Sequence, residues 1–186
     1  RRGSLGVLSI AAMTLGQEAY YADLAREDYY RAGGEPPGRW LGGGAKELGL
    51  AGLVDGEDLS RLFLGRDPHG DRSLVQGQRY SDGRQRQPGW DLTFSAPKSV
   101  SVLWALADDD ARGAIEEAQA DAVQRALTYL EDAASWTRRG HAGGYAERAG
   151  LVVAAFEHGT SRAKDPQLHT HALVLNVAAR DDGTWG

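Results

Sequence analysis

The sequence predicts an α+β fold in which a central antiparallel β-sheet is flanked by helices. Residues 151–156 and 172–177 are apolar and β-prone, and the polar stretch between them contains the turn signal Asp165-Pro166. Residues 90–94 alternate as a strand does, whereas residues 108–134 show the longest helical spacing in the chain. Strands joined by a short polar loop pair in opposite directions, so we expect an antiparallel sheet with helices packed on it.

Composition sets the limits within which this fold must form. The chain has 186 residues, of which 41% are hydrophobic, and this is enough for one domain with its own core. It contains no apolar run near the roughly 20 residues that a membrane span needs, so we expect no membrane partner. Without cysteine, any bound metal must be held by nitrogen and oxygen. Residues 1–6 are expected to be a tag or extra N-terminal residues, and residues 7–186 the domain.

The first half of the chain is expected to alternate short elements with loops. An apolar run at 7–13 predicts the first strand, and a helix-prone segment follows Gly16. We expect a loop at 40–44 and short helices at 45–50 and 56–64, the second capped by Asp55. Residues 65–88 are polar and are expected to be irregular.

The second half is expected to supply most of the sheet and its covering helices. After the strand at 90–94, Ser95 is a candidate cap and Pro97 suits the first turn of a helix at 98–106. We expect that helix to pack through Val100, Leu103 and Trp104. The helix at 108–134 is expected to begin with Asp110 as its cap and to face the core with Ile115, Ala118, Ala122, Leu127 and Leu130. A hairpin is expected at 136–147. Because the chain stops just after a turn signal at 181–183, we expect a domain truncated at its C-terminus.

Three of the five histidines, His158, His169 and His171, lie at the loop-facing ends of the two apolar strands. Side chains two apart on a strand share a face, so His169 and His171 should lie roughly 6.5 to 7 Å apart. A histidine from the neighbouring strand can complete a three-nitrogen site for one metal ion. The alternative is that these are ordinary surface or core histidines; the His-x-His spacing with a third histidine across a hairpin favours the metal site. His69 and His141 have no partners at ligand spacing and are predicted not to be ligands.

Two tyrosine pairs, Tyr20-Tyr21 and Tyr29-Tyr30, stand out near the N-terminus. Such pairs usually pack an amphipathic helix on a core, which is the alternative to a chemical role. In an unbroken helix, Tyr20 and Tyr29 would lie about 180° apart around the axis and about 13.5 Å apart along it, so they could not share one face. Asp91 is also unusual for a strand, and its alternative is an exposed acid at a strand end.

Several of these stretches together resemble one family. The run VLSIAAM, the pairs in YYADLAREDYY, the segment GWDLTFSAPKSVSVLW and the final HGTSRAKDPQLHTHALVLN occur in the order found in the N-terminal relaxase domain of conjugative relaxase–helicases, the MobF class of HUH endonucleases. The resemblance covers the chain from about residue 7 to its end. It implies the palm-like fold of those relaxases. Because the relaxase domain of the family is longer than this chain and is followed by a helicase domain, we expect the C-terminal part of the relaxase domain and the helicase domain to be missing here.

The resemblance implies a metal-dependent, strand-specific nuclease that nicks DNA at a plasmid transfer origin. Tyr20 matches the nucleophile, which forms a 5′-phosphotyrosine link and frees a 3′-OH. Tyr29 matches a second nucleophile used when transfer ends, with Tyr21 and Tyr30 as auxiliary residues. The metal ligands of the family match His158, His169 and His171. Asp91 matches the acid beside the metal, where it orients a histidine or takes the tyrosine proton.

The cofactor and partners are likewise implied by the resemblance. We expect one divalent ion, Mg²⁺ or Mn²⁺ in function, with Zn²⁺, Ni²⁺ or another transition metal as alternatives. Expected partners are single-stranded transfer-origin DNA and the accessory and coupling proteins of the relaxosome, around a monomer in the bacterial cytoplasm. The basic side chains expected to contact DNA are Arg79, Arg84, Arg86, Lys98, Arg162 and Lys164.

Charge and motif order help to choose between functions. The net charge of −5 mildly opposes nucleic-acid binding, but the acids and bases are clustered in different parts of the sequence, so charge does not decide the question. A rolling-circle replication-initiator nickase also uses paired histidines and a tyrosine, but there the tyrosine usually follows the histidines, whereas here it precedes them. The sequence is also compatible with a histidine-ligated metal hydrolase and with a non-catalytic module that binds single strands.

Overall fold

A computed structural model of the chain describes residues 7–17, 20, 36–76, 85–140, 143–161 and 163–186. The strands are β1 (Val7–Ala12), β2 (Arg39–Leu41), β3 (Gly89–Ser95), β4 (Trp136–Arg139), β5 (Tyr145–Thr160) and β6 (Pro166–Arg180). The helices are α3 (Gly43–Glu47), α4 (Gly56–Phe63), α5 (Lys98–Leu106) and α6 (Asp109–Ala134). The main sheet has the order β1-β3-β6-β5-β2, with β4 paired to β5, and its pairs are antiparallel. The predicted fold class is therefore confirmed.

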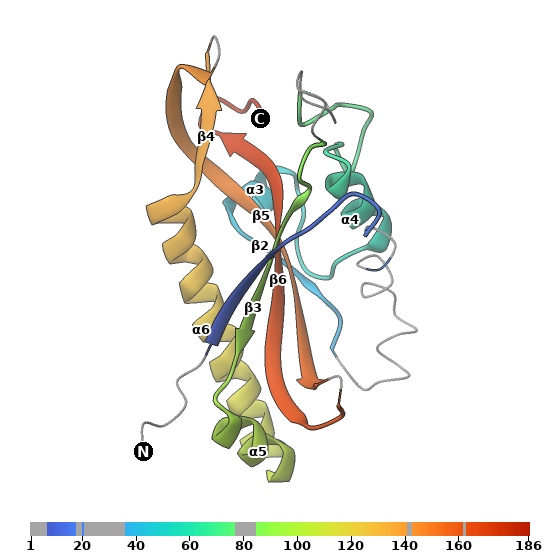
Figure 1. The fold of residues 1–186 in the computed structure, drawn as a ribbon, viewed down its shortest axis with the longest axis vertical. Coiled ribbons are helices and arrows are strands. Elements are labelled where there is room, and N and C mark those ends of the chain that lie inside the picture. The colour runs from blue at the N-terminus through green and yellow to red at the C-terminus, as the bar shows by residue number, and fades with distance from the viewer. Residues whose placement is uncertain (1–6, 18–19, 21–35, 77–84, 141–142, 162) are drawn as a thin grey trace.

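The hairpin of β5 and β6 is the centre of the sheet (Figure 1). Its strands contain 16 and 15 residues, and the predicted turn signal Asp165-Pro166 lies where the loop between them meets β6. The register places His158 directly opposite His169. It shifts by one residue between His158 and Thr160, an irregularity that bends a strand and re-aims its side chains. The predicted β4–β5 hairpin at 136–147 is also present.

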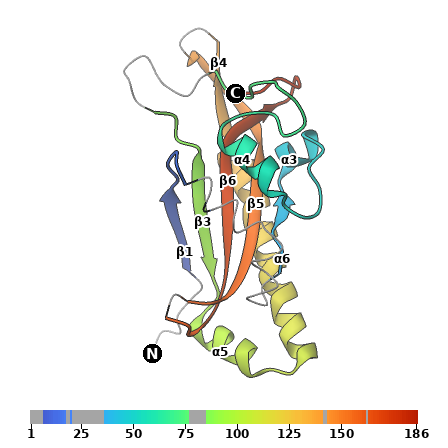
Figure 2. The same cartoon turned by 90° about the vertical axis from the view of Figure 1, so that its right-hand side faces the viewer.

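Different helices cover the two faces of the sheet (Figures 1 and 2). On one face, Phe156 and Leu173 pack in a buried cluster with side chains of α4, including Phe63. On the other face, Val123 and Leu127 of α6 pack with strand residues that include Val153 and Val174. Successive strand residues point to opposite faces, so β5 and β6 contribute side chains to the buried clusters on both faces of the sheet. Burying each such side chain stabilises the fold by about 1.5–3 kcal/mol, which fixes the hairpin firmly in place.

The segment at 40–44 is not the loop that the sequence predicted. Trp40 lies in β2 opposite Ala154 and is buried, and α3 begins at Gly43. Gly42 adopts a positive φ of 95° between strand and helix. A three-residue strand is too short to show alternation, and the adjacent glycines indicated a loop, so the sequence pattern was misleading.

One of the three predicted helix caps is confirmed and two differ. Asp55 caps α4 as expected, accepting hydrogen bonds from the backbone N–H groups of Glu57 at 2.8 Å and Asp58 at 3.1 Å. Helix α6 is instead capped by Asp108, which accepts from the N–H of Ala111, whereas Asp110 lies inside the first turn. Three consecutive aspartates are equally suited to the cap, so sequence alone does not select one. The residue before α5 is Pro97, and Ser95 remains in β3.

The helix faces are partly different from the predicted ones. Leu127 is buried as expected, but the second buried residue of α6 is Val123, while Ala118 and Ala122 are exposed. Leu103 of α5 is 60% exposed, contrary to the expected packing. Over a long helix, a small error in the assumed period rotates the predicted face by one residue, which explains the exchange of Ala122 for Val123. Among the described helices, none is long and apolar enough to cross a membrane.

Candidate metal centre

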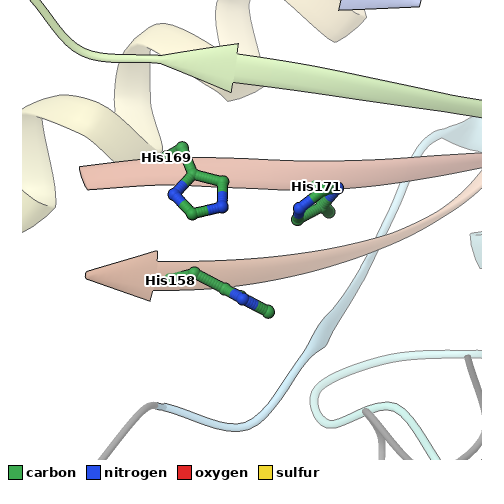
Figure 3. A group of neighbouring side chains, drawn as sticks. All are labelled: His158, His169 and His171. Atoms are coloured by element: carbon green, nitrogen blue, oxygen red, sulfur yellow. The ribbon is translucent and has the colours of Figure 1, made fainter. Parts of the chain in front are cut away.

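Three histidine rings converge at the loop end of the central hairpin (Figure 3). His158 comes from β5, and His169 and His171 come from the neighbouring strand β6. The ring centroids lie 5.3 Å apart for His158 and His169, 5.2 Å for His158 and His171, and 5.1 Å for His169 and His171. One ring nitrogen of each lies within 4.8 Å of the others. The structure therefore brings together the three histidines that their sequence spacing selected.

Asp91 holds one of these rings from the adjacent strand. Both of its carboxylate oxygens lie 2.9 Å from Nδ1 of His171, and the residue is only 9% exposed. The alternative of an exposed acid at a strand end is therefore wrong. Because a neutral ring that donates its Nδ1–H to a carboxylate has its lone pair on Nε2, Asp91 sets the tautomer that leaves Nε2 available to a cation.

His169 is oriented in the same way by the backbone. Its Nδ1 lies 2.8 Å from the carbonyl oxygen of Gln167, so the ring donates there and keeps its lone pair on Nε2. The hydroxyl of Thr93 lies 3.3 Å from Nδ1 of His171 and 3.5 Å from a carboxylate oxygen of Asp91. The sequence interpretation missed Thr93. Its signal was present, because residues two apart on a strand share a face and Asp91 precedes Thr93 by two.

The surroundings favour uncharged imidazoles. Burial, together with the neighbouring rings of His171 and His169 and against an opposing effect of Asp91, lowers the pKa of His158 to about 4. Burial also lowers the pKa of His169, although the hydrogen bond to Gln167 acts in the opposite direction. Near neutral pH these two rings are therefore uncharged, which is the form in which imidazole binds a metal ion.

The donor set fits a divalent metal ion. Nitrogens bound to one ion at about 2.1 Å lie about 3.0 to 3.4 Å from one another, so small ring rotations are enough to gather these three. Three imidazoles suit transition metals, and three protein ligands leave coordination positions open for a further ligand. The cluster lies beside the register shift of β5 and β6, and its three rings come from these two paired strands.

Helix α5 braces this end of the hairpin. The hydroxyl of Ser101 accepts a hydrogen bond of 3.0 Å from the backbone N–H of Leu168, next to His169. The ring of Trp104 lies so close to Gly159 that a side chain there would collide with it. Nζ of Lys98 donates to the carbonyl of Pro166 at 2.8 Å. The helix therefore holds both strands that carry the histidines.

Apart from Arg86, the other predicted site residues fall into three groups. Tyr20 is helical and 60% exposed. The residues that lie outside the described part of the chain are Tyr21, Tyr29, Tyr30, Arg79, Arg84, His141 and Arg162. Lys164 is exposed in the hairpin loop, at the same end of the sheet as the histidines, with a φ of 61°.

Arg86 requires a correction. It is only 4% exposed, and its guanidinium donates to the backbone carbonyls of Phe63, at 3.1 Å, and Asn176. It joins the end of α4 to β6 and cannot contact a DNA backbone from that position. A cluster of arginines in the sequence does not distinguish a buried backbone-binding arginine from a surface one.

The fold and the histidine–aspartate cluster define the class of protein as a relaxase-type member of the HUH endonucleases. Residues 15–186 match the TrwC relaxase family, and the chain belongs to that family. It is 43% identical over 172 residues to the multifunctional conjugation protein TraI of Escherichia coli strain K12, covering 89% of this chain and 9% of TraI.

Solved structures of TrwC share the fold. The copper-bound structure of the conjugative relaxase TrwC in complex with oriT DNA matches with a TM-score of 0.79 and 40% identity, covering 96% of this chain and 60% of that one. TrwC complexed with a 27-mer DNA comprising the recognition hairpin and the cleavage site matches with a TM-score of 0.79 and 36% identity. That match covers 96% of this chain and 59% of the TrwC chain. The chain therefore spans about three fifths of those structures and less than a tenth of TraI.

Proposed function

We propose that this chain is the nicking domain of a conjugative relaxase, which cuts one DNA strand at a plasmid transfer origin by transesterification. The observation that carries the proposal is the convergence of three histidines, one of them held by Asp91, in a member of the TrwC relaxase family. Of the TrwC structures that it matches, one contains oriT DNA and another a 27-mer DNA with the recognition hairpin and the cleavage site, which supports single-stranded origin DNA as its substrate.

The proposed nucleophile is Tyr20. Its hydroxyl oxygen forms a bond to the scissile phosphorus and the bond from phosphorus to the 3′ oxygen breaks. The phenol loses its proton, and the departing oxygen gains one and becomes a 3′-OH. Tyrosine hydroxyls generally ionise near pH 10, so this step needs a local field that favours the phenolate. One phosphodiester is exchanged for another, so the strand can be rejoined without ATP.

His158, His169 and His171 are the proposed ligands of the metal ion. When bound, a divalent ion supplies positive charge to the phosphate oxygens on which negative charge grows. Asp91 fixes the tautomer of His171 and so acts as a positioning residue. We propose Mg²⁺ or Mn²⁺ as the ion used in the cell. The three-nitrogen set also accepts Zn²⁺ or Ni²⁺, and Mn²⁺ tolerates both imidazole and phosphate oxygen as ligands.

The other residues of the proposal extend the site along the DNA. Tyr29 is the proposed second nucleophile for the strand transfer that ends conjugation, and Tyr21 and Tyr30 are auxiliary. Proposed contacts to the phosphate backbone come from Arg79, Arg84, Lys98, Arg162 and Lys164. Relaxosome accessory and coupling proteins are the proposed partners of a monomer that acts in the bacterial cytoplasm.

The test is a covalent adduct. The protein is incubated with Mn²⁺ and a single-stranded oligonucleotide that carries the transfer origin of its plasmid, and the products are separated on a denaturing gel. We expect a protein–DNA band that Tyr20→Phe abolishes and that His69→Ala, outside the cluster, retains. Free 5′-phosphate product without an adduct indicates a hydrolase, and no cleavage by the full-length relaxase indicates a binding module; either result contradicts the proposal.

A further inference from the structure

A cavity of about 570 Å³ lies on the opposite face of the sheet from the histidines, between α6 and strands β2, β5 and β6. Glu157 and Thr170 are paired across β5 and β6 and line this cavity. They alternate in sequence with His158, His169 and His171, so their side chains point away from the metal centre. The cavity is therefore separate from the site described above, with the two strands as the wall between them.

The hydroxyl of Thr170 is the most informative group in this cavity. Thr170 is only 3% exposed, and its Oγ1 has no hydrogen-bond partner among the described residues. One carboxylate oxygen of the neighbouring Glu157 is also buried without a partner in the same part of the structure. Buried polar groups are normally paired, so an unpaired hydroxyl and an unpaired carboxylate oxygen on one cavity wall, both of which can accept, indicate a donor supplied from outside.

The charge of the lining specifies what kind of donor this is. Four carboxylates, those of Glu116, Glu117, Asp121 and Glu157, line the cavity with the single guanidinium of Arg39, which gives a formal charge of −3. Two of the carboxylates already have partners, because Glu116 accepts from Trp104 Nε1 at 2.8 Å and Asp121 pairs with Arg125 at 2.8 Å. Of the other two, Glu117 is exposed, and Glu157 is paired with Thr170 across the strands, where Arg39 opposes the negative charge of Glu116, so the ligand that complements the net negative lining is cationic.

The cation is an organic one. The only described group of three acidic or histidine side chains close enough to hold a metal ion is the histidine cluster on the other face. The acids of the cavity are therefore too widely spaced to enclose a compact ion. Leu41, Val123 and Ala155 add apolar wall to the same cavity, which suits an aliphatic stem.

We propose that this cavity binds a guanidinium group on an apolar stem, the side chain of an arginine from another polypeptide segment. A guanidinium carries five N–H donors in a fixed plane, so it can donate to the hydroxyl of Thr170 and to the carboxylate of Glu157 at once. Its aliphatic carbons would lie against Leu41 and Val123. The proposal stands on the cavity alone and does not depend on the DNA-nicking function.

N-acetyl-arginine amide is the probe, and N-acetyl-citrulline amide is the uncharged control of the same shape. Both are titrated into the whole chain and binding is followed by NMR chemical shifts. We expect saturable shifts centred on Thr170 and Glu157, and binding of the citrulline compound weaker by about tenfold or more, as for loss of a charged hydrogen bond. No saturable binding, or equal binding of both compounds, overturns the proposal.

Variants locate the binding. Glu157→Gln and Thr170→Val, which remove a charge and a hydroxyl at nearly constant volume, are each expected to weaken binding by about tenfold. Asp110→Asn removes an exposed charge of α6 that does not line the cavity, and is expected to leave binding unchanged. The melting temperature and metal binding at the histidines verify the fold of each variant. Equal probe binding by the folded Glu157→Gln variant and the unmodified chain overturns the proposal even if Thr170→Val fails to fold.

Discussion

Both carboxylate oxygens of Asp91 lie 2.9 Å from Nδ1 of His171, across the pairing of β3 with β6. One strand of the sheet therefore provides the ring, and its neighbour provides the acid that fixes the tautomer of that ring. Such an acid acts through the ligand, by making Nε2 more basic and holding the ring in place. Loss of this contact should weaken metal binding while leaving the three histidines present.

Asp91→Asn is expected to lower metal affinity by about 10- to 100-fold, the usual effect of removing a partner that orients a ligand. The amide keeps the size of the side chain but loses the charge that holds the Nδ1 proton. Isothermal titration calorimetry with Mn²⁺ or Ni²⁺ measures the change. Thr93→Val is the matched comparison. It should lower the metal affinity less than Asp91→Asn does, because the Thr93 hydroxyl lies 3.3 Å from Nδ1 of His171, farther than the oxygens of Asp91 at 2.9 Å. Unchanged affinity in Asp91→Asn contradicts this role.

His169→Ala is expected to abolish metal binding and DNA cleavage together, because two remaining imidazoles form a much weaker site. His69→Ala is the control, since His69 is not a member of the cluster. Calorimetry gives the metal affinity, and the denaturing gel gives the extent of adduct formation. If His169→Ala binds the metal as tightly as the unaltered chain does, the ligand assignment is wrong.

The metal-free protein is expected to lose stability as the pH falls from about 6.5 to about 4. Burial and neighbouring rings hold the pKa of His158 at about 4, below its ordinary value of 6.5. Between these values the unfolded chain binds more protons than the folded one, so the free energy of unfolding decreases with decreasing pH. Urea denaturation in the presence of a chelator measures it. His158→Gln should show a smaller decrease across this range, and an identical decrease would show that His158 does not contribute.

Two glycine substitutions should have opposite effects on stability. Gly159→Ala places a methyl group against the ring of Trp104, whose Nε1 is bound to Glu116, so the ring cannot move aside without losing that bond. We expect a loss of about 1–3 kcal/mol in the free energy of unfolding. Gly113→Ala lies in α6 with open space around it and should gain about 0.5–1 kcal/mol. Urea melts of both variants test the pair, and equal changes would contradict the packing of α5 on the hairpin.

The hairpin of β5 and β6 and its three histidines were predictable because the sequence features that indicate them lie close together in the chain. Alternation fixes which residues share a face, and a short polar loop fixes that the strands pair, so the proximity of His158 to His169 followed from the sequence alone. The expectation for Asp91 came from resemblance. Its hydrogen bond depends on β3 lying next to β6, a pairing between residues about 80 apart that alternation does not encode.

The errors arose where a choice depends on tertiary contacts. Arg86 resembles a surface arginine in the sequence, but in the fold it bonds to two carbonyls in the interior. Trp40 was assigned to a loop because its neighbours are glycines, although pairing with Ala154 makes it a strand residue. In both cases the deciding partners come from segments far away in the chain, so local propensity had no information about them.

We propose that Tyr20 forms the covalent link to DNA with the help of the histidine-bound metal, and the linked peptide identifies the residue. Trypsin separates the tyrosine pairs, because cleavage after Arg26 leaves the first pair in peptide 3–26 and the second in peptide 27–31. The adduct formed with Mn²⁺ is digested with nuclease and trypsin, and the peptide that carries the nucleotide is sequenced by mass spectrometry. We expect a nucleotide on Tyr20 in peptide 3–26, and no such nucleotide when metal is left out. A nucleotide found only on peptide 27–31, or an adduct of equal yield in the His169→Ala variant, would contradict it.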